Sequence, residues 1–547
     1  MKSIDWQLAT PQHDQVIDSS LSLFQYQEAP FVSLQPRLNA SLKRFIALAD
    51  DAPLLAINGS DTVSVKKDVA SILSQLTQKS VHHTESIVAE ELLGSYIVTD
   101  SGDVQSSVGL FEKHSNGYLI ISANAVLSQP TTLLAIRALL AGEDVARVAA
   151  SKNGFSPKQR FKSAVKLIIV GDRNQLADLD YLDPAFSSSH TMFTEVEMDV
   201  RVDTTTAPLY LGYIVSLVRE AGLPDMSSDA IHSFLTAGAR VCEEQHFAPL
   251  SASWIRALLR EAALESNAET IEAKHIDAAL EARYYRESYL PNRALDDILD
   301  GQVLIQTQGN EVGQVNGLTV IDIPGHPVSY GEPARISCVI HFGDGDVSDV
   351  ERKAELGGNL HAKGMMIMQA FLSSALNLDE PLPYSASIVF EQSYSEVDGD
   401  SASLAELCAF VSALSGYEIK QNIAVTGAVD QFGRVQAVGG LNEKIEGFFY
   451  VCAHQGLTGD QGVILPKSNL RHLSLHKDVV DAIKQGKFHI WSVEDVNQAL
   501  PIITGQAFSG ESDDTILNKI AERIDRLNQH DISESLLNRL KRVLFRD

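Results

Sequence analysis

Two segments of the chain combine residue types that can support acyl-transfer chemistry. The first, DGDSAS at 398–403, places a serine on a short glycine-containing turn between an apolar strand pattern and a helix pattern. Backbone N–H groups at the start of a helix can hold a developing oxyanion. A serine hydroxyl is a poor nucleophile without a base, so this segment needs a partner. It also fits a structural role, because Ser403 and Glu406 have the spacing of a helix capping box.

The second segment, GGLNEKIEG at 439–447, carries a lysine that can act as that base. Lys444 falls in the first turns of a predicted helix whose apolar face includes Leu441, Ile445 and Phe448. Desolvation beside such a face lowers a lysine pKa toward roughly 7–8, where the neutral amine can accept a proton. Taken alone, Lys444 fits equally the ordinary role of a solvated surface lysine.

Together the two segments resemble the proteolytic domain of Lon proteases. The serine signature of that family is an aspartate, a glycine, a variable residue and Ser-Ala, which match 398–402. A strand ending in Thr426 and Gly427 follows, and then a Gly-Gly-x-x-x-Lys element that ends at Lys444. Upstream, the segments 313–320 and 351–364 are also similar to this domain, so the resemblance covers residues 300–505.

The resemblance implies a role for each matching residue. Ser401 is expected to be the nucleophile and Lys444 the general base, so that a Ser/Lys dyad replaces a Ser/His/Asp triad. Thr426 is expected to help orient Lys444, and Asp398 to shape and modulate the site.

Two further residues near these motifs carry weaker expectations. His361 lies in the upstream motif and is expected to have a structural or supporting role. Asp400 stands where many family members have proline. A carboxylate beside the nucleophile would raise the pKa of Lys444, which bears on the level of activity more than on the mechanism.

Changes in the spacing of apolar residues predict the helices and strands that position these residues. Apolar strands at 53–59, 118–122 and 165–172 alternate with helix patterns, which predicts a doubly wound α/β domain over 36–210. Residues 211–299 have helical periodicity, and 300–505 mix short strands and helices as an α+β domain. An irregular segment, 1–35, precedes them, and a helical tail, 506–547, follows. The predicted fold class is therefore multidomain α/β and α+β.

The segments 117–130, 165–186 and 272–286 are similar to parts of the AAA+ ATPase module found in the LonB-like branch of the family. The resemblance therefore extends through residues 36–290, with the helical segment as the lid of that module. The phosphate-binding residues of that module are missing, however. A P-loop needs G-x-x-x-x-G-K-[ST], whereas counting from Gly59 places Ser64, Val65 and Lys66 at the last three positions. The strand that should end in Asp-Glu ends in Ser-Ala-Asn at 122–124. We therefore expect no cofactor and regard ATP binding as doubtful; the alternative is a nucleotide bound through an unusual loop.

The bulk composition narrows the class of protein further. The formal net charge is −27, with 71 acidic against 44 basic residues among 547, which argues against general nucleic-acid binding. The four cysteines form no C-x-x-C pair, as expected of reduced thiols in a cytosol. The first residues contain no apolar signal core, and no segment has the ~18 apolar residues needed to span a membrane. A cytoplasmic protein is expected.

Three functions remain open at this point. The leading hypothesis is a Lon-type serine endopeptidase that cleaves unfolded polypeptides or peptides without ATP hydrolysis. The resemblance also implies a homohexameric ring. The first alternative is a conventional ATP-dependent protease with a divergent nucleotide site. The second is a non-proteolytic chaperone or binding module, against which the presence of both Ser401 and Lys444 argues.

Overall fold

The computed structural model describes residues 2–48, 53–86, 88–150, 159–184, 191–343, 347–377, 384–392, 399–512 and 514–526. The chain forms two compact units. The N-terminal unit comprises Val16–Ile231 and Ala248–Ile276, and the C-terminal unit comprises Met1–Gln15, His232–Phe247 and Asp277–Asp547. The five predicted segments divide the chain differently and stay a prediction.

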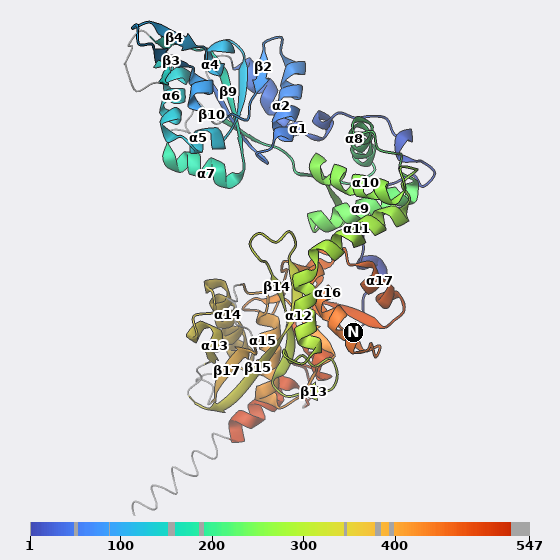
Figure 1. Cartoon of the computed structure of the whole chain (residues 1–547). Coiled ribbons are helices and arrows are strands. Elements are labelled where there is room, and N and C mark those ends of the chain that lie inside the picture. Colours follow the sequence, from blue (N-terminus) through green and yellow to red (C-terminus); the bar gives the residue numbers. More distant parts are fainter. Residues whose placement is uncertain are drawn as a thin grey trace, which may run out of the picture. The chain divides into compact units, whose positions relative to one another are not determined.

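A five-stranded parallel sheet forms the core of the N-terminal unit (Figure 1). Its two faces carry separate apolar cores, because alternate residues of a strand point to opposite sides. Leu55 and Ile57 pack with α1 and α2, whereas Leu54 and Ala56 pack with α6. The doubly wound arrangement predicted for 36–210 is therefore present. The strands, in sheet order, are β10 (Thr191–Glu195), β1 (Leu54–Asn58), β9 (Lys166–Gly171), β5 (Tyr118–Ser122) and β2 (Val81–His83); the main helices are α1 (Pro36–Ala47), α2 (Val63–Leu76), α5 (Asn124–Leu127), α6 (Pro130–Leu140) and α7 (Arg173–Leu182).

The helices predicted after the sheet are also present, and residues at their ends stop or start them. Ser251 caps α10, where its hydroxyl accepts a hydrogen bond from the Trp254 N–H at 3.4 Å. Gly222 follows α8 with a φ of 64°, a conformation that favours glycine. The helices are α8 (Ala207–Glu220), α9 (Ser228–Cys242), α10 (Ala252–Glu265), α11 (Ala273–Glu287) and α12 (Tyr289–Leu299); α9 and α11 each have residues in both units.

A seven-stranded mixed sheet forms the core of the C-terminal unit. The strands β14 and β15 are antiparallel, as are β15 and β17, while β14, β19, β22 and β23 run parallel. In sheet order the strands are β16 (Val347–Asp349), β17 (Tyr384–Phe390), β15 (Tyr330–Phe342), β14 (Gln314–Ile321), β19 (Ile423–Val425), β22 (Gln461–Pro466) and β23 (Phe488–Val493).

Helices cover both faces of this sheet, and two of them lead to the candidate site. One core surrounds α15, all of whose residues are buried, and includes Ile423 and Val425 of β19. The other core surrounds α16 and includes Ala424, the residue between them. The helices α15 and α16 therefore lie on opposite faces of the sheet. The helices are α13 (Val350–Lys353), α14 (Asn359–Ala375), α15 (Ser403–Ser415), α16 (Leu441–Gln455), α17 (Lys477–Lys484) and α18 (Val496–Thr504).

Segments from both ends of the chain pack on the C-terminal unit. The Ile4 N–H donates to the Ile490 carbonyl, and Ala9 joins the core around α16. Residues 516–526 are helical, and Ile516 and Ile520 join the core around α15. The described part of the predicted tail thus packs on its own domain; residues 527–547 lie outside the described residues.

Candidate active site

Ser401 lies on the turn that leads into α15. Gly399 has a φ of 127°, which is open to glycine and strained for other residues, and Ala402 is the N-cap of the helix. The Ser401 side chain is half-buried. Asp398, the residue expected to modulate the site, lies outside the described residues.

Ser403 does not cap α15. Its hydroxyl accepts a hydrogen bond from the Val429 N–H at 3.0 Å, and Glu406 is fully buried against His361. The capping-box interpretation of this segment is therefore wrong, because tertiary contacts take up both side chains. Ser403 instead ties the start of α15 to the strand that follows Gly427.

Lys444 lies beside Ser401, although the two residues reach the site from opposite faces of the sheet. The Lys444 Nζ donates a hydrogen bond to the Ser401 Oγ at 3.0 Å. Lys444 is 4% exposed, and burial lowers its pKa to about 8. The carboxylates of Asp400 and Glu443 oppose this shift, as expected for Asp400 from the sequence. A substantial fraction of the amine is therefore neutral near pH 8, as a general base must be.

Two glycines fix the helix that carries Lys444 against the sheet. A Cβ on Gly331 of β15 would lie 2.0 Å from the Glu443 carbonyl oxygen, and one on Gly447 of α16 would lie 2.1 Å from the Gly331 carbonyl oxygen. Helix and strand thus pack backbone to backbone at this point. Such close contact leaves the amine little freedom to move away from Ser401.

Thr426 directly follows β19 and is fully buried. Its hydroxyl donates to the Ser401 carbonyl oxygen at 3.3 Å, and the Gly427 N–H donates to the same oxygen at 2.9 Å. The hydrogen bond of this hydroxyl thus holds the backbone of Ser401 rather than the Lys444 amine. The role in orienting Lys444 that the resemblance implies stays a prediction.

Arg240 of α9 neutralises the acidic side chains beside Lys444, a contact that the sequence analysis did not predict. Its guanidinium donates to Glu443 at 2.7 Å and to Glu446 at 2.5 and 2.9 Å. Burial opposes the charge of Arg240, but Glu446 and Glu443 raise its pKa above the usual range. Because Arg240 lies 203 residues from Glu443 in the chain, local periodicity carries no signal of the pair.

His361 belongs to a buried cluster of acidic side chains behind the serine turn. Its Nε2 lies 3.2 Å from Asp349 and its Nδ1 lies 3.4 Å from Glu406. Burial alone would lower the pKa of His361, but Asp349 and Glu406 raise it. Burial raises the pKa of Glu406 to about 7. On the same helix a Cβ on Gly364 would lie 3.3 Å from the Asp400 side chain, so α14 supports the serine turn as well.

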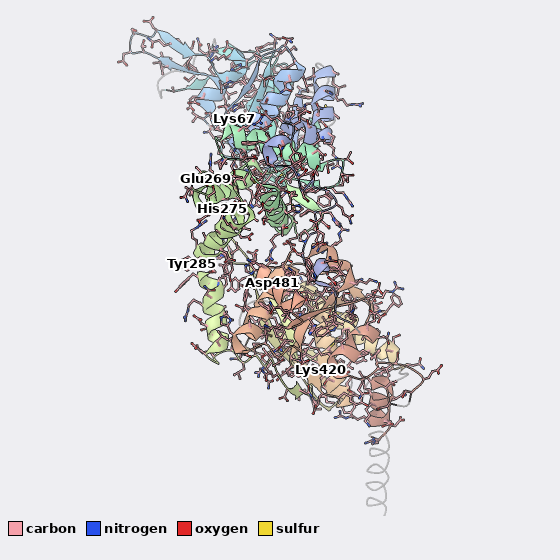
Figure 2. The ribbon with its side chains drawn as sticks, turned by 90° about the vertical axis from the view of Figure 1, so that its right-hand side faces the viewer. Lys67, Glu269, His275, Tyr285, Lys420 and Asp481 are labelled. Atoms are coloured by element: carbon pink, nitrogen blue, oxygen red, sulfur yellow. The ribbon has the colours of Figure 1, made fainter. Side chains whose placement is uncertain are left out.

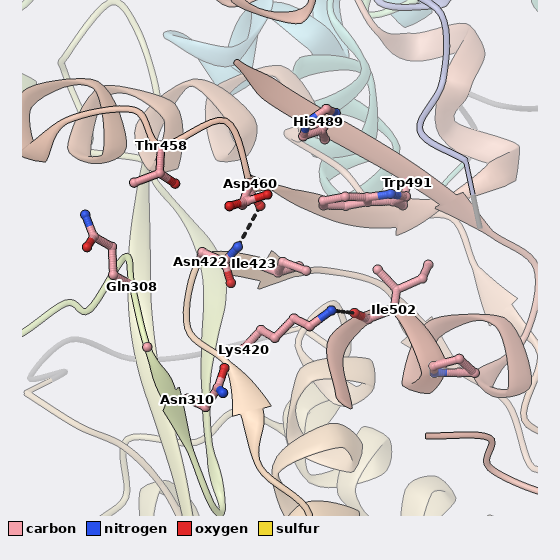
Figure 3. Close-up of a pocket in the computed structure, with 12 residues that line it drawn as sticks. Gln308, Asn310, Lys420, Asn422, Ile423, Thr458, Asp460, His489, Trp491 and Ile502 are labelled. Atoms are coloured by element: carbon pink, nitrogen blue, oxygen red, sulfur yellow. Dashed lines mark hydrogen bonds between the residues drawn. The ribbon is translucent and has the colours of Figure 1, made fainter. Parts of the chain in front are cut away.

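A cavity of about 630 Å³ opens elsewhere in the C-terminal unit (Figure 3). It is lined by polar side chains and by Trp491, and neither Ser401 nor Lys444 belongs to its lining. Its polar groups are already engaged: Lys420 donates to the Ile502 carbonyl at 3.1 Å, and Asn422 donates to the Asp460 carbonyl at 2.7 Å. The cavity is therefore separate from the Ser401/Lys444 pair.

The nucleotide implied by the resemblance does not fit the loop after β1. Only residues 59–62 separate β1 from α2, and Thr62 caps the helix with its own hydroxyl. Lys66 is fully buried and forms ion pairs with Asp61 and Glu85. Val65 stands at the position of the P-loop lysine, and the adjacent Lys66 is engaged within the protein.

Within the described residues, no group of three or more His, Cys, Asp or Glu side chains is arranged to hold a metal ion. The helices described in the structure include none long and apolar enough to cross a membrane.

Known proteins similar to this chain share one family. A family model for the Lon protease (S16) C-terminal proteolytic domain matches residues 392–504. A putative Lon protease homologue of Escherichia coli K12 is 44% identical over 448 residues, which cover 81% of this chain and 76% of that protein. A putative Lon protease homologue of Haemophilus influenzae is 40% identical over 446 residues, with 81% and 74% covered. An archaeal Lon protease of Thermococcus kodakarensis is 26% identical over 312 residues, which cover 56% of this chain and 45% of that protein.

The two bacterial relatives extend the similarity well beyond the proteolytic domain, because each alignment covers about four fifths of this chain. The matched domain contains both Ser401 and Lys444. The chain therefore belongs to the Lon protease family and is a serine endopeptidase of that family.

Proposed function

We propose that this protein cleaves unfolded polypeptides with Ser401 as nucleophile and Lys444 as general base, and that cleavage needs no ATP hydrolysis. The observation that supports the dyad is the 3.0 Å contact between the Ser401 hydroxyl and the Lys444 amine, together with the burial that lowers the pKa of Lys444 to about 8. Covalent catalysis requires a nucleophile and a nearby base, and a serine next to a desolvated lysine supplies both.

The proposed reaction follows the general steps of acyl transfer. The neutral Lys444 amine accepts the Ser401 hydroxyl proton while Oγ bonds to the scissile carbonyl carbon. The tetrahedral intermediate then collapses, and the Lys444 ammonium protonates the departing amine. Water then attacks the resulting ester while Lys444 accepts one of its protons, and the Lys444 ammonium gives that proton to the Ser401 oxygen as the acyl–oxygen bond breaks and the second peptide leaves.

The developing oxyanion needs hydrogen-bond donors close to Ser401. Among the residues that the structure describes, the Ala402 N–H at the start of α15 has no acceptor, and it directly follows the nucleophile. The partial positive charge of a helix N-terminus favours an anion at this position. We assign this N–H as one donor of the proposed oxyanion hole.

The independence from ATP rests on the internal engagement of Lys66 and on the lack of carboxylates at 122–124. Without hydrolysis the protein has no power stroke to unfold stable substrates, so loose polypeptides are its proposed targets. A homohexameric ring is part of the same proposal, because heterologous contacts between identical chains close into rings. A cytoplasmic location agrees with Cys338, Cys408 and Cys452, which are buried free thiols.

Three measurements test the proposal. A fluorophosphonate probe should label the wild type at Ser401, and Lys444→Ala should abolish that labelling; a wild type that takes up no probe would favour a non-proteolytic binding module. Cleavage of an unfolded protein should proceed equally with and without Mg-ATP, while a stable folded protein is spared. Acceleration by ATP that a non-hydrolysable analogue does not reproduce would favour an ATP-dependent protease. Light scattering at micromolar concentration should give the mass of a hexamer.

A further inference from the structure

A carboxylate of the chain itself occupies the edge of the parallel sheet in the N-terminal unit. Asp61 lies in the short loop between β1 and α2, and its side chain is 8% exposed. The strands β1, β9 and β5 are parallel, so their carboxyl ends meet at this edge. Open α/β sheets bind ligands outside the carboxyl ends of their strands. The surroundings of Asp61 therefore determine whether an external anion can enter.

Four side chains from four different positions in the fold donate hydrogen bonds to this carboxylate. Lys66 of α2 donates to Oδ1 at 2.5 Å, and Ser122 at the end of β5 donates to Oδ2. Asn124 of α5 and Gln175 of α7 donate to the same Oδ2 at 3.3 and 3.2 Å. A buried cation and several neutral donors that converge on one acceptor make up an anion-binding site.

The burial of Lys66 makes an anion at this position necessary. Lys66 is fully buried, and a buried ammonium without a counterion is strongly unfavourable. Its second partner, Glu85, lies 3.2 Å away but is 46% exposed, so water screens that pair. Asp61 is thus the main counterion of Lys66. It also fills the space that the phosphate of a ligand would need in order to reach the same donors.

We propose that Lys66, Ser122, Asn124 and Gln175 form an anion site that the protein keeps filled with its own Asp61 carboxylate. Nucleotide phosphates are then excluded by a counterion built into the fold, in addition to the missing P-loop residues. This inference rests on the proposed independence from ATP hydrolysis, for which it offers a structural cause. It does not depend on the Ser401/Lys444 dyad.

Removing the carboxylate should convert the filled site into one that binds inorganic phosphate. In the full-length protein, Asp61→Ala should lower the Tm in chloride buffer, because Lys66 loses its counterion. Phosphate at about ten times its Kd should then raise the Tm by about 3–6 °C at constant ionic strength. Since Glu85 repels an incoming anion, the titration should extend through millimolar phosphate. The wild type should show no such rise.

Two lysines on the same helix separate a specific site from general charge effects. Adding Lys66→Met to Asp61→Ala should abolish the phosphate response. Adding Lys67→Met should leave the response intact, because Lys67 is the next residue on α2 and is exposed (Figure 2). If Asp61→Ala does not fold, Asp61→Ser tests the same idea, because serine also leaves room for the anion.

Two results would overturn the inference. One is a folded Asp61→Ala or Asp61→Ser variant that phosphate does not stabilise. The other is a wild type that phosphate or Mg-ATP stabilises as much as the variants, which would mean that Asp61 does not occupy the site. Neither result bears on whether fluorophosphonate labels Ser401, so failure here remains distinct from failure of the proposed dyad.

Discussion

Lys66 and Lys444 are both buried near the start of a helix, in two different sheets of the molecule, but they contact different kinds of side chain. Each is the fourth residue of its helix, and each is buried, with exposures of 0% and 4%. Lys66 faces the carboxylates of Asp61 and Glu85. Lys444 faces the hydroxyl of Ser401, and Arg240 engages its acidic neighbour Glu443.

The comparison shows that burial alone does not make a lysine a base. A carboxylate beside a buried lysine compensates its charge as an ion pair, whereas a hydroxyl leaves that charge uncompensated and can itself give up a proton. On the proposed mechanism, the ion pair at Lys66 serves stability, and the hydroxyl contact at Lys444 serves proton transfer. Variants at both lysines can test this distinction.

The largest expected effect is the loss of peptide hydrolysis when either member of the dyad is removed. Ser401→Ala and Lys444→Ala should each lower kcat/KM by at least about 10³-fold, because nucleophile and base act as one unit. Lys444→Arg should be equally inactive, since a guanidinium does not give up its proton near neutral pH. Steady-state kinetics on a fluorogenic peptide measure the effect.

The matched control for these variants is Lys467→Ala, which removes an exposed lysine paired only with the exposed Glu494. It should retain wild-type kcat/KM. Substantial hydrolysis by Ser401→Ala, with circular dichroism showing an intact fold, would contradict the dyad.

Replacing the two lysines by methionine should change stability in opposite directions. Lys66→Met leaves Asp61 without its cation and should lower the free energy of unfolding by about 3 kcal/mol. Lys444→Met removes an amine whose folded-state pKa is lowered from 10.5 to about 8. At pH 7 the ammonium destabilises the fold, so this variant should be neutral or more stable by up to about 3 kcal/mol. Denaturant unfolding of each variant measures the change in the free energy of unfolding. Equal destabilisation by Lys66→Met and Lys444→Met would show that the two buried lysines do not differ in this way.

The pH dependence of activity should follow the titration of Lys444. The neutral amine is the active form, so kcat/KM should rise with pH and level off above the pKa of about 8. Unfolding stability should also rise between about pH 8 and 10.5, because there the unfolded chain binds more protons than the folded one. A profile of kcat/KM that is flat from pH 6 to 9 would exclude Lys444 as the titrating base.

The smallest expected effects are shifts of this profile by neighbouring charges. The carboxylate of Asp400 raises the pKa of Lys444, so Asp400→Asn should move the profile to lower pH by about half a unit to one unit. Arg240→Gln frees the charge of Glu443 and should move the profile to higher pH by a similar amount. Shifts in the same direction for both variants would mean that they act through structure rather than through charge.

The sequence predicted that Ser401 and Lys444 belong to one site, where they are in contact, and it predicted the alternation of strands and helices, but not most contacts of the other polar side chains. Ser401 and Lys444 could be identified from the sequence because each lies in a short glycine-containing motif, and the two motifs follow each other in the order typical of the family. The capping-box prediction at Ser403 failed because the two side chains found partners in distant strands and helices. The cluster at Asp61 brings together side chains as far apart in the chain as Asp61 and Gln175. A local sequence pattern cannot predict contacts over such a distance.

The approach of Ser401 and Lys444 from opposite faces of one sheet has a consequence for the synthesis of the protein. Ser401 is positioned by the core around α15, which includes residues as far along the chain as Ile524, and Lys444 by the core around α16, which includes residues as far as Ile490. A chain growing from a ribosome has therefore exposed Ser401 long before the layer that positions Lys444 can fold. On the proposed mechanism, the dyad is therefore incomplete until both cores of its own domain have been synthesised.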